Sequence, residues 1–214
     1  MVNALLTALL SILFLAGPAA AQPLSHERAL QALSHKDVQV RRQAASRLGE
    51  IGAMADVRPL AKALRDADED TRENAEKSLW QIWARSGNPE VDKLYLAGVE
   101  QMSGGDLKTS IVTFTRIIAL KPDFAEGWNK RATLYFMAGE YMKSLADCGE
   151  VIKRNPQHFG ALAGYGQIYV RLEDYEHALE YFRRALEVNP NMDSVRLNMM
   201  VIERLMEQRR KRMI

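Results

Sequence analysis

The sequence predicts an all-helical solenoid, built from short helices that pack antiparallel and stack along the chain. Three prolines, Pro122, Pro156 and Pro190, stand 34 residues apart, which indicates a repeated structural unit. Within each interval the apolar residues recur at helical spacing, and no stretch reads convincingly as a strand. Each proline is expected between helices, where its missing N–H removes no hydrogen bond.

This period divides part of the chain into three consecutive units, at residues 91–124, 125–158 and 159–192. One equivalent position in all three units is occupied by a small residue. Small side chains let the two helices of a unit approach closely. These residues are Gly98, Ala132 and Gly166. Before the second unit, Asp123 and Glu126 have the spacing of a capping box, in which both side chains close the start of a helix.

The pattern resembles the tetratricopeptide repeat (TPR) family over residues 91–192. The third unit matches the family most fully, through Leu162, Tyr165, Gly166, Tyr169, Tyr175, Ala178, Phe182, Ala185 and Pro190. The second unit departs from the family at Arg131, Ser144 and Cys148, and we expect it to pack less tightly. The resemblance implies a right-handed α–α superhelix, in which the first helix of each unit lines the concave face.

A second periodicity of 31 residues precedes the TPR-like region. It relates Asp37 to Asp68, Ala44 to Ala75, and Leu48 to Leu79. Residues 22–88 resemble two HEAT-like units of the short kind found in bilin-lyase-type repeat proteins. The resemblance implies that an aspartate in each turn caps the following helix. It also implies that arginines such as Arg41 and Arg42 pair with carboxylates of the adjacent unit.

A junction and a terminal helix complete the predicted organisation into domains. Residues 86–89, with the sequence Ser-Gly-Asn-Pro, should end one helix. They should join the HEAT-like segment closely to the three TPR units, which occupy residues 89–192. We expect Trp80 or Trp83 to pack against the first TPR unit and fix the angle between the arrays. Residues 193–214 should form a capping helix with a basic end and an apolar stripe of Val195, Met199, Ile202 and Met206.

Residues 1–21 are predicted to be a signal peptide. A Leu-rich apolar run from Ala4 to Ala16 is followed by Gly17-Pro18 and three alanines, which suit cleavage after Ala21. The run is short for a membrane span, and the segment before it holds no Lys or Arg. An uncleaved anchor and a buried helix of a cytosolic protein are the two alternatives.

Composition argues against two classes of function. The net charge of +2 lacks the basic excess of a dedicated nucleic-acid binder. The single cysteine, Cys148, falls at a core-facing position, and no pair of the four histidines has helical metal-ligand spacing. We therefore expect no catalytic residues, no metal site and no cofactor.

The TPR resemblance places the partner-binding surface in the concave groove. It assigns to this surface Tyr95, Val99 and Met102 from the first unit, Asn129, Thr133 and Phe136 from the second, and Ala163, Gln167 and Arg171 from the third. The amide groups there can bond a peptide backbone, and Arg171 can hold a carboxylate. Tyr95 and Val99 stand where the chaperone-binding TPR subset has lysine and asparagine, so that specificity is not supported.

These observations predict an exported scaffold or adaptor that binds a protein or peptide, periplasmic if the host is a Gram-negative bacterium and otherwise secreted. One alternative is a membrane-tethered envelope assembly factor, with residues 4–16 retained and the basic cluster Arg209, Arg210, Lys211 and Arg212 near lipid. Another is a carrier of a small ligand or prosthetic group through the HEAT-like segment. A homo-oligomer is also compatible with the sequence.

Overall fold

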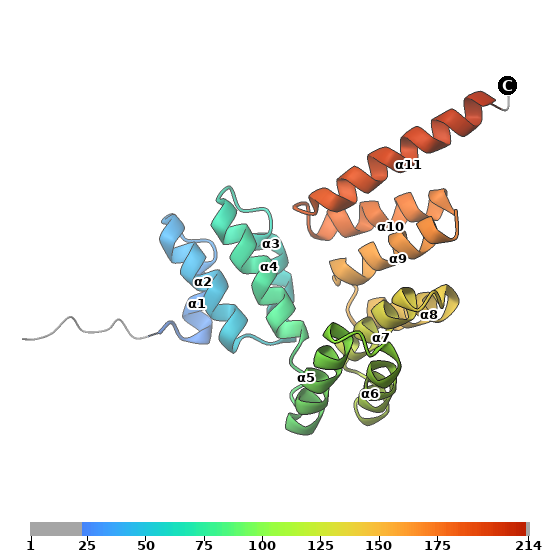
Figure 1. The fold of residues 1–214 in the computed structure, drawn as a ribbon. Helices are drawn as coiled ribbons and strands as arrows, with labels where there is room; N and C mark the ends of the chain where they lie inside the picture. The colour runs from blue at the N-terminus through green and yellow to red at the C-terminus, as the bar shows by residue number, and fades with distance from the viewer. Residues whose placement is uncertain (1–22, 213–214) are drawn as a thin grey trace, which may run out of the picture.

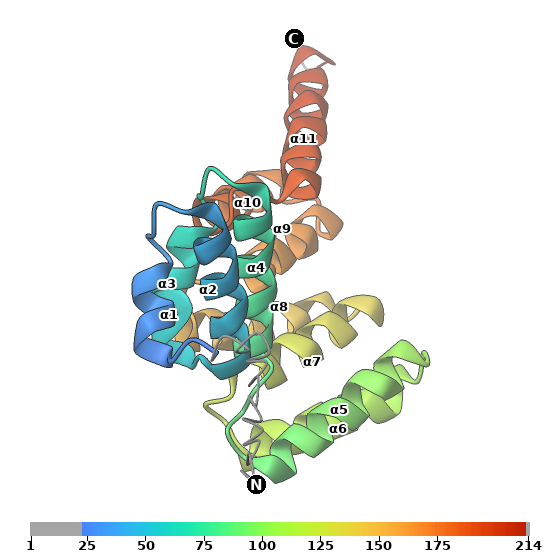
Figure 2. The same ribbon diagram turned by 90° about the vertical axis from the view of Figure 1, so that its left-hand side faces the viewer.

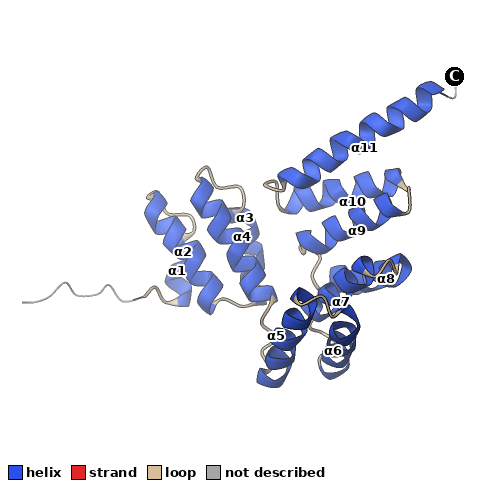
Figure 3. Cartoon of the chain, in the orientation of Figure 1, coloured by secondary structure: helices blue, strands red, loops and turns tan. Residues whose placement is uncertain are grey.

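The computed structural model describes residues 23–212, so the predicted signal peptide lies outside the described residues. This part of the chain is entirely helical, without a strand, and the predicted all-helical solenoid is confirmed (Figure 3). The HEAT-like segment holds α1 (His26–Ala32), α2 (Val38–Ile51), the 3-10 helix η1 (Met54–Asp56), α3 (Val57–Ala63) and α4 (Glu69–Trp83). The TPR region holds α5 (Pro89–Ser103), α6 (Leu107–Leu120), α7 (Ala125–Met137), α8 (Tyr141–Arg154), α9 (Phe159–Arg171), α10 (Tyr175–Val188) and α11 (Asp193–Arg212).

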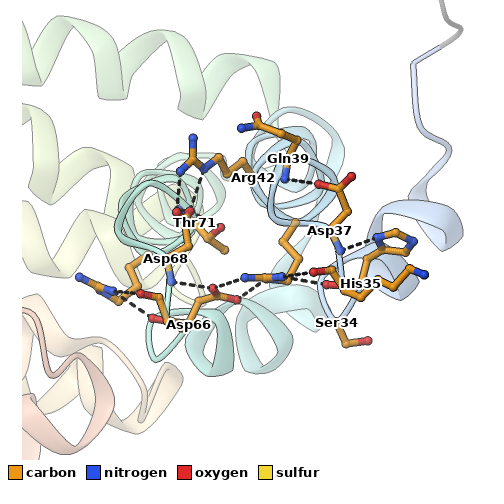
Figure 4. A network of polar contacts seen from close by, with 12 residues as sticks. Ser34, His35, Asp37, Gln39, Arg42, Asp66, Asp68 and Thr71 are labelled. Atoms are coloured by element: carbon orange, nitrogen blue, oxygen red, sulfur yellow. Dashed lines mark hydrogen bonds and ion pairs between the residues drawn. The ribbon is translucent and has the colours of Figure 1, made fainter.

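Aspartate caps and arginine pairs organise the HEAT-like segment. Asp37 accepts a hydrogen bond from the backbone N–H of Gln39 at the start of α2, and Asp68 does the same for Thr71 at the start of α4. Arg41 binds both carboxylate oxygens of Asp66, at 2.7 and 2.8 Å, and Arg42 binds Asp68 from the neighbouring helix (Figure 4). Both expectations for these residues are therefore met, and Asp66 and Asp68 each tie two repeat units together.

In the TPR region, α5 with α6, α7 with α8, and α9 with α10 form three antiparallel hairpins (Figure 1). Close packing explains the small residues, since a Cβ at Gly98 would lie 2.8 Å from the ring of Phe114. The polar residues at which the second unit differs from the family pattern form hydrogen bonds within the fold. Arg131 binds both carboxylate oxygens of Asp147, and the buried hydroxyl of Ser144 donates to the carbonyl of Ala132 at 2.7 Å.

The HEAT-like segment docks on the TPR array at a place that differs from the prediction. Trp80 and Trp83 pack against His158 and Phe159, which lie where the second TPR unit meets the third, and not against the first unit. Phe159 is buried in the same apolar core as α2, α3 and α4. The chain turns sharply after Gly87, so that α4 faces the start of α9 and the end of α10 (Figures 1 and 2).

Polar contacts extend this interface to the end of the third unit. Arg65 donates to the backbone carbonyls of Glu187 and Val188, the last residues of α10. Asn191, in the next turn, donates to the carbonyl of Leu64 at 2.8 Å. Because these groups come from both arrays, the interface joins segments more than 100 residues apart in sequence.

The last helix, α11, packs on α10 and continues beyond it (Figure 1). Val195 and Ile202 are buried against the third unit, and Met199 and Met206 are half-buried beside them. No helix between residues 23 and 212 combines the length and apolar character needed to cross a membrane.

Candidate functional site

The candidate site is a groove between α7, α9 and α11 that encloses a cavity of about 330 Å³. Three of the predicted groove residues, Phe136, Gln167 and Arg171, lie together along it. The other lining residues are Val170, Tyr175, Phe182, Asn198, Val201, Ile202 and Leu205. The groove is therefore walled on one side by first helices of TPR units and on the other by the terminal helix.

A cation beside exposed apolar side chains defines the chemistry of this groove. The guanidinium of Arg171 lies 5.8 Å from the centre of the Phe136 ring, close enough for a cation–π contact. Among the described residues no carboxylate forms an ion pair with Arg171, so its hydrogen-bond donors are available to a ligand. Val201 and Leu205 keep 51% and 41% of their surface exposed, although both line the cavity.

Sequence reasoning missed the contribution of α11 to this groove. It assigned the helix one apolar stripe, which packs on α10, whereas Val201 and Leu205 lie on a different face with Asn198. The sequence does indicate this second apolar face, because Leu197, Val201 and Leu205 recur every four residues. A helix with two apolar faces has a second surface to cover.

The remaining predicted residues are not brought into this groove. Val99 and Met102 pack into the core of the first unit, and Ala163 is buried in the core of the third. Asn129 is buried and donates from its side-chain amide to Glu126, while the hydroxyl of Thr133 donates to the carbonyl of Asn129. Their hydrogen-bonding groups and surfaces are therefore used within the fold. Tyr95 lines a different cavity, which is described next.

A second cavity, of about 760 Å³, lies between α4 and the helices α5 and α7. Trp80 forms part of its wall, and Tyr95, Glu126 and Lys130 line its TPR side. The rim carries residues of α4, namely Glu73, Glu76, Lys77 and Gln81. This cavity shares no lining residue with the groove between α7, α9 and α11, so the two are separate.

Glu126 does not take part in the predicted capping box. Phe124 precedes α7 without a side-chain cap, and the Glu126 carboxylate turns into the protein, where 1% of the residue is exposed. It accepts hydrogen bonds from His158 Nε2 at 2.9 Å and from Asn129 at 3.1 Å, and it pairs with Lys130. Interaction with a distant histidine therefore replaced the local cap.

The tautomer of His158 follows from its two contacts. Its Nδ1 accepts the backbone N–H of Ala161 at the start of α9, at 3.1 Å, so Nε2 carries the proton that is donated to Glu126. Burial alone would raise the pKa of Glu126, but the hydrogen bond from His158 and the charge of Lys130 lower this pKa below its ordinary value. Burial, and next the charge of Glu126, raises the pKa of Tyr95. This network holds three helices together and presents no exposed nucleophile.

The lone thiol has the properties of a core residue. Cys148 is 2% exposed, and burial, with a smaller effect of Asp147, raises the pKa of the thiol to about 12. The thiol is therefore protonated at neutral pH. Across residues 23–212, no three side chains of histidine, cysteine, aspartate or glutamate are placed to hold a metal ion together.

Comparison with known proteins agrees with this architecture. The family model for the tetratricopeptide repeat matches residues 163–192, and the model for HEAT repeats matches residues 7–94. A TPR repeat-containing protein of Rhizobium etli is 32% identical over 59% of this chain and 62% of its own length. The small glutamine-rich tetratricopeptide repeat-containing protein of Dictyostelium discoideum is 29% identical over 65% of this chain and 43% of its own length.

Two solved structures share the fold of the TPR region. The Sgt2 TPR domain from Aspergillus fumigatus has a TM-score of 0.55 and 22% identity, over 58% of this chain and 83% of that domain. The first TPR of Spaghetti (RPAP3), solved with an HSP90 peptide, has a TM-score of 0.53 and 20% identity, over 55% of this chain and 93% of that domain.

Stacked helical hairpins around a concave groove define a repeat solenoid protein. The chain is similar to tetratricopeptide repeat proteins in its TPR region and to HEAT repeats in its N-terminal segment, and it spans less than two thirds of the length of the curated relatives named above.

Proposed function

We propose that this protein is an interaction scaffold that binds a peptide or short helical segment of a partner in the groove between α7, α9 and α11. The observation that carries the proposal is the guanidinium of Arg171, which is unpaired among the described residues and lies beside Phe136 and the exposed apolar face of α11. A segment with a carboxylate next to apolar side chains complements such a surface. The peptide held by the first TPR of RPAP3 supports this mode of binding by analogy of fold.

A pull-down with mass spectrometry tests the groove. The bait is the tagged protein, and the test variant combines Phe136→Ala, Gln167→Ala and Arg171→Ala. A matched control combines Lys108→Ala, Val112→Ala and Met142→Ala, which are exposed residues outside the groove. We expect a partner that wild type and control retain and the groove variant loses, with unchanged circular dichroism. Equal retention by both variants would move the binding site away from this groove.

We further propose that the protein is exported, and that it is periplasmic in a Gram-negative host. Support comes from the apolar run of residues 4–16 and the small residues before Gln22. Intact-mass measurement of the protein purified from its host tests this point, because cleavage leaves Gln22 as the first residue. A chain that retains Met1 and sediments with membranes would instead support the membrane-tethered assembly factor.

The second cavity favours one other function. Its volume of about 760 Å³ and its aromatic residues Trp80 and Tyr95 suit a small ligand held between the two arrays. Native mass spectrometry of freshly purified protein tests this function. A bound species that is lost on Trp80→Ala but retained by the groove variant would support carriage of a small molecule.

A further inference from the structure

A third cavity, of about 520 Å³, lies in the HEAT-like segment between α1 and α3. These two helices form one layer of the segment, and α2 and α4 form the other (Figure 2). The cavity shares no lining residue with the groove of α7, α9 and α11 or with the cavity beside Trp80. It is therefore a separate surface, which neither of the binding functions proposed above uses.

The α3 wall of this third cavity is basic. Arg58 and Lys62 lie four residues apart on one face of α3, and Arg65 follows in the turn that ends the helix. Arg58 and Lys62 are exposed, and neither forms an ion pair with a carboxylate of the described residues. Arg65 donates to the backbone carbonyls of Glu187 and Val188, so it is held in place without a carboxylate partner. Three cations thus line one wall.

The acidic residue of the lining does not cancel this charge. Asp66 accepts two hydrogen bonds from the guanidinium of Arg41, at 2.7 and 2.8 Å, so its charge is already neutralised. The sequence of α3 from Val57 to Ala63 contains neither aspartate nor glutamate. The cavity therefore keeps an excess of positive charge, which a ligand with carboxylates complements.

The α1 wall of the same cavity is largely apolar. It consists of Leu30 and Leu33, which are half-buried, and of Ser34. Pro59 and Ala63 add apolar surface from α3 beside the cations. A free phosphate ion, or the flat headgroup layer of a membrane, would leave this concave apolar surface uncovered. A peptide covers it, because a peptide brings acidic and apolar side chains together.

We propose that this third cavity binds an extended acidic segment of a partner protein, in which acidic and apolar side chains alternate. Arg58 and Lys62 are separated by four residues of helix, which is about 6 Å along its axis. In an extended peptide, side chains two positions apart share one side and are separated by about 6.7 Å. Two such acidic residues can each reach one cation. The residue between them points the other way, toward Leu30 and Leu33.

Fluorescence anisotropy of the full-length protein with a labelled probe peptide tests this cavity. The probe holds three glutamates separated by two leucines, with glycine and serine at both ends and blocked termini. The test variant, called the α3 variant, combines Arg58→Glu and Lys62→Glu. The matched control combines Lys93→Glu and Lys108→Glu, which change the net charge equally at exposed positions of the first TPR unit.

We expect wild type and control to bind the probe alike, and the α3 variant to bind at least about tenfold more weakly, with unchanged circular dichroism. Raising the salt concentration should weaken the binding to wild type, because salt screens the exposed cations. Equal binding by the α3 variant and the control, or a wild type that does not bind the probe, would overturn the proposal.

Changes to the probe identify the chemistry that is recognised. Lysines in place of the glutamates should abolish binding, and serines in place of the leucines should weaken it. A serine probe that binds as well as the original would overturn the alternating pattern. Cosedimentation with phosphatidylglycerol vesicles tests the membrane as occupant. Vesicles that bind wild type but not the α3 variant, together with a probe that does not bind, would assign the cavity to a lipid surface and overturn the proposal.

The groove variant separates this proposal from the proposed function. It should bind the probe as wild type does, because Arg171 lines the groove and not the third cavity. A probe that is lost by the groove variant and retained by the α3 variant would place the acidic segment in the groove. That outcome would overturn this proposal and support the proposed function.

Discussion

At the scale of single residues, the molecule depends on a few polar and charged groups that form hydrogen bonds across repeat boundaries. The most buried of them are Glu126 and His158, which are 1% and 0% exposed. His158 bonds Glu126 with one ring nitrogen, caps α9 with the other, and stacks on Trp83 with the ring centres 4.2 Å apart. One side chain therefore connects two TPR units and the HEAT-like segment.

Replacing His158 should be costly for stability. His158→Ala leaves the buried Glu126 carboxylate with one hydrogen bond fewer, and a buried polar group left short of a partner costs about 1 to 3 kcal/mol, or more for a charged one. We expect a loss near that size in the free energy of unfolding, measured by urea denaturation. His177→Ala is the control, because His177 is exposed and should change stability by less than about 0.5 kcal/mol. Similar effects of the two substitutions would contradict the role given to His158.

The carboxylate of Asp68 links stability to pH. The hydrogen bond from Arg42 holds the pKa of Asp68 well below its ordinary value of 3.8, with help from Thr71. A carboxylate with a lowered folded-state pKa stabilises the fold above its unfolded-state pKa, and this contribution is lost as the pH falls toward the folded-state pKa. Arg42→Ala should therefore lower the Tm at pH 7, and the difference from wild type should shrink below about pH 4.

Thermal unfolding followed by circular dichroism across pH 2 to 7 measures this difference. Arg58→Ala serves as the control, since Arg58 is exposed in the same segment. A gap between wild type and Arg42→Ala that stays constant over the whole pH range would show that Arg42 acts through packing and not through Asp68.

At the scale of one element, two glycines of α9 differ in how closely their neighbours pack against them. Gly166 faces the ring of Phe182, which a Cβ at that position would overlap. Gly164, half a turn earlier, would place a Cβ 3.8 Å from the sulfur of Cys148, which is an ordinary contact distance. The close approach of α9 to α10 therefore requires only the first of these two glycines.

Alanine substitutions at the two positions should have effects of opposite sign. Gly164→Ala removes the helix penalty of glycine and should stabilise the protein by up to about 1 kcal/mol. Gly166→Ala forces the buried ring of Phe182 to move and should destabilise it by about 1 to 3 kcal/mol. Chemical denaturation of both variants gives the comparison. If Gly166→Ala were as stable as Gly164→Ala, the hairpin would be less tightly packed than its geometry indicates.

At the scale of the whole molecule, the HEAT-like segment and the TPR array share one interface. Trp80 lies over Gly160, where a Cβ would overlap its ring, and Trp83 packs on His158 and Phe159. Arg65 and Asn191 add hydrogen bonds to backbone carbonyls across the same interface. Because this contact lies in the core of the HEAT-like segment, the two arrays should unfold together.

Trp83→Ala should uncouple the two arrays. Loss of a buried tryptophan costs about 3 to 5 kcal/mol, and here the loss falls on the shared interface. We expect the single thermal transition of wild type to split into two, and the radius of gyration in X-ray scattering to increase. Trp128→Ala, on the other side of the TPR array, should keep one transition. An unchanged melting curve for residues 89–214 in the full-length Trp83→Ala protein would exclude this role for Trp83.

The sequence by itself determined the repeats and the helices. Helix periodicity, proline spacing and capping aspartates are local properties, and each is visible within a few turns of chain. They were sufficient to predict the solenoid and the small residues between paired helices. The resemblance to HEAT-like units implied the arginine–aspartate pairs, and the resemblance to TPR units placed Phe136, Gln167 and Arg171 on the concave surface, where they line one cavity.

Only the tertiary structure decided where the two arrays meet and which groove residues stay accessible. The curvature of the chain brings α4 to His158 and Phe159, and the Trp80 side of this contact forms one wall of a cavity that is separate from the groove. Glu126 illustrates the reason: its local spacing predicts a helix cap, but a histidine 32 residues away forms the stronger buried bond. Contacts between distant segments depend on the summed geometry of all units, which no local pattern contains.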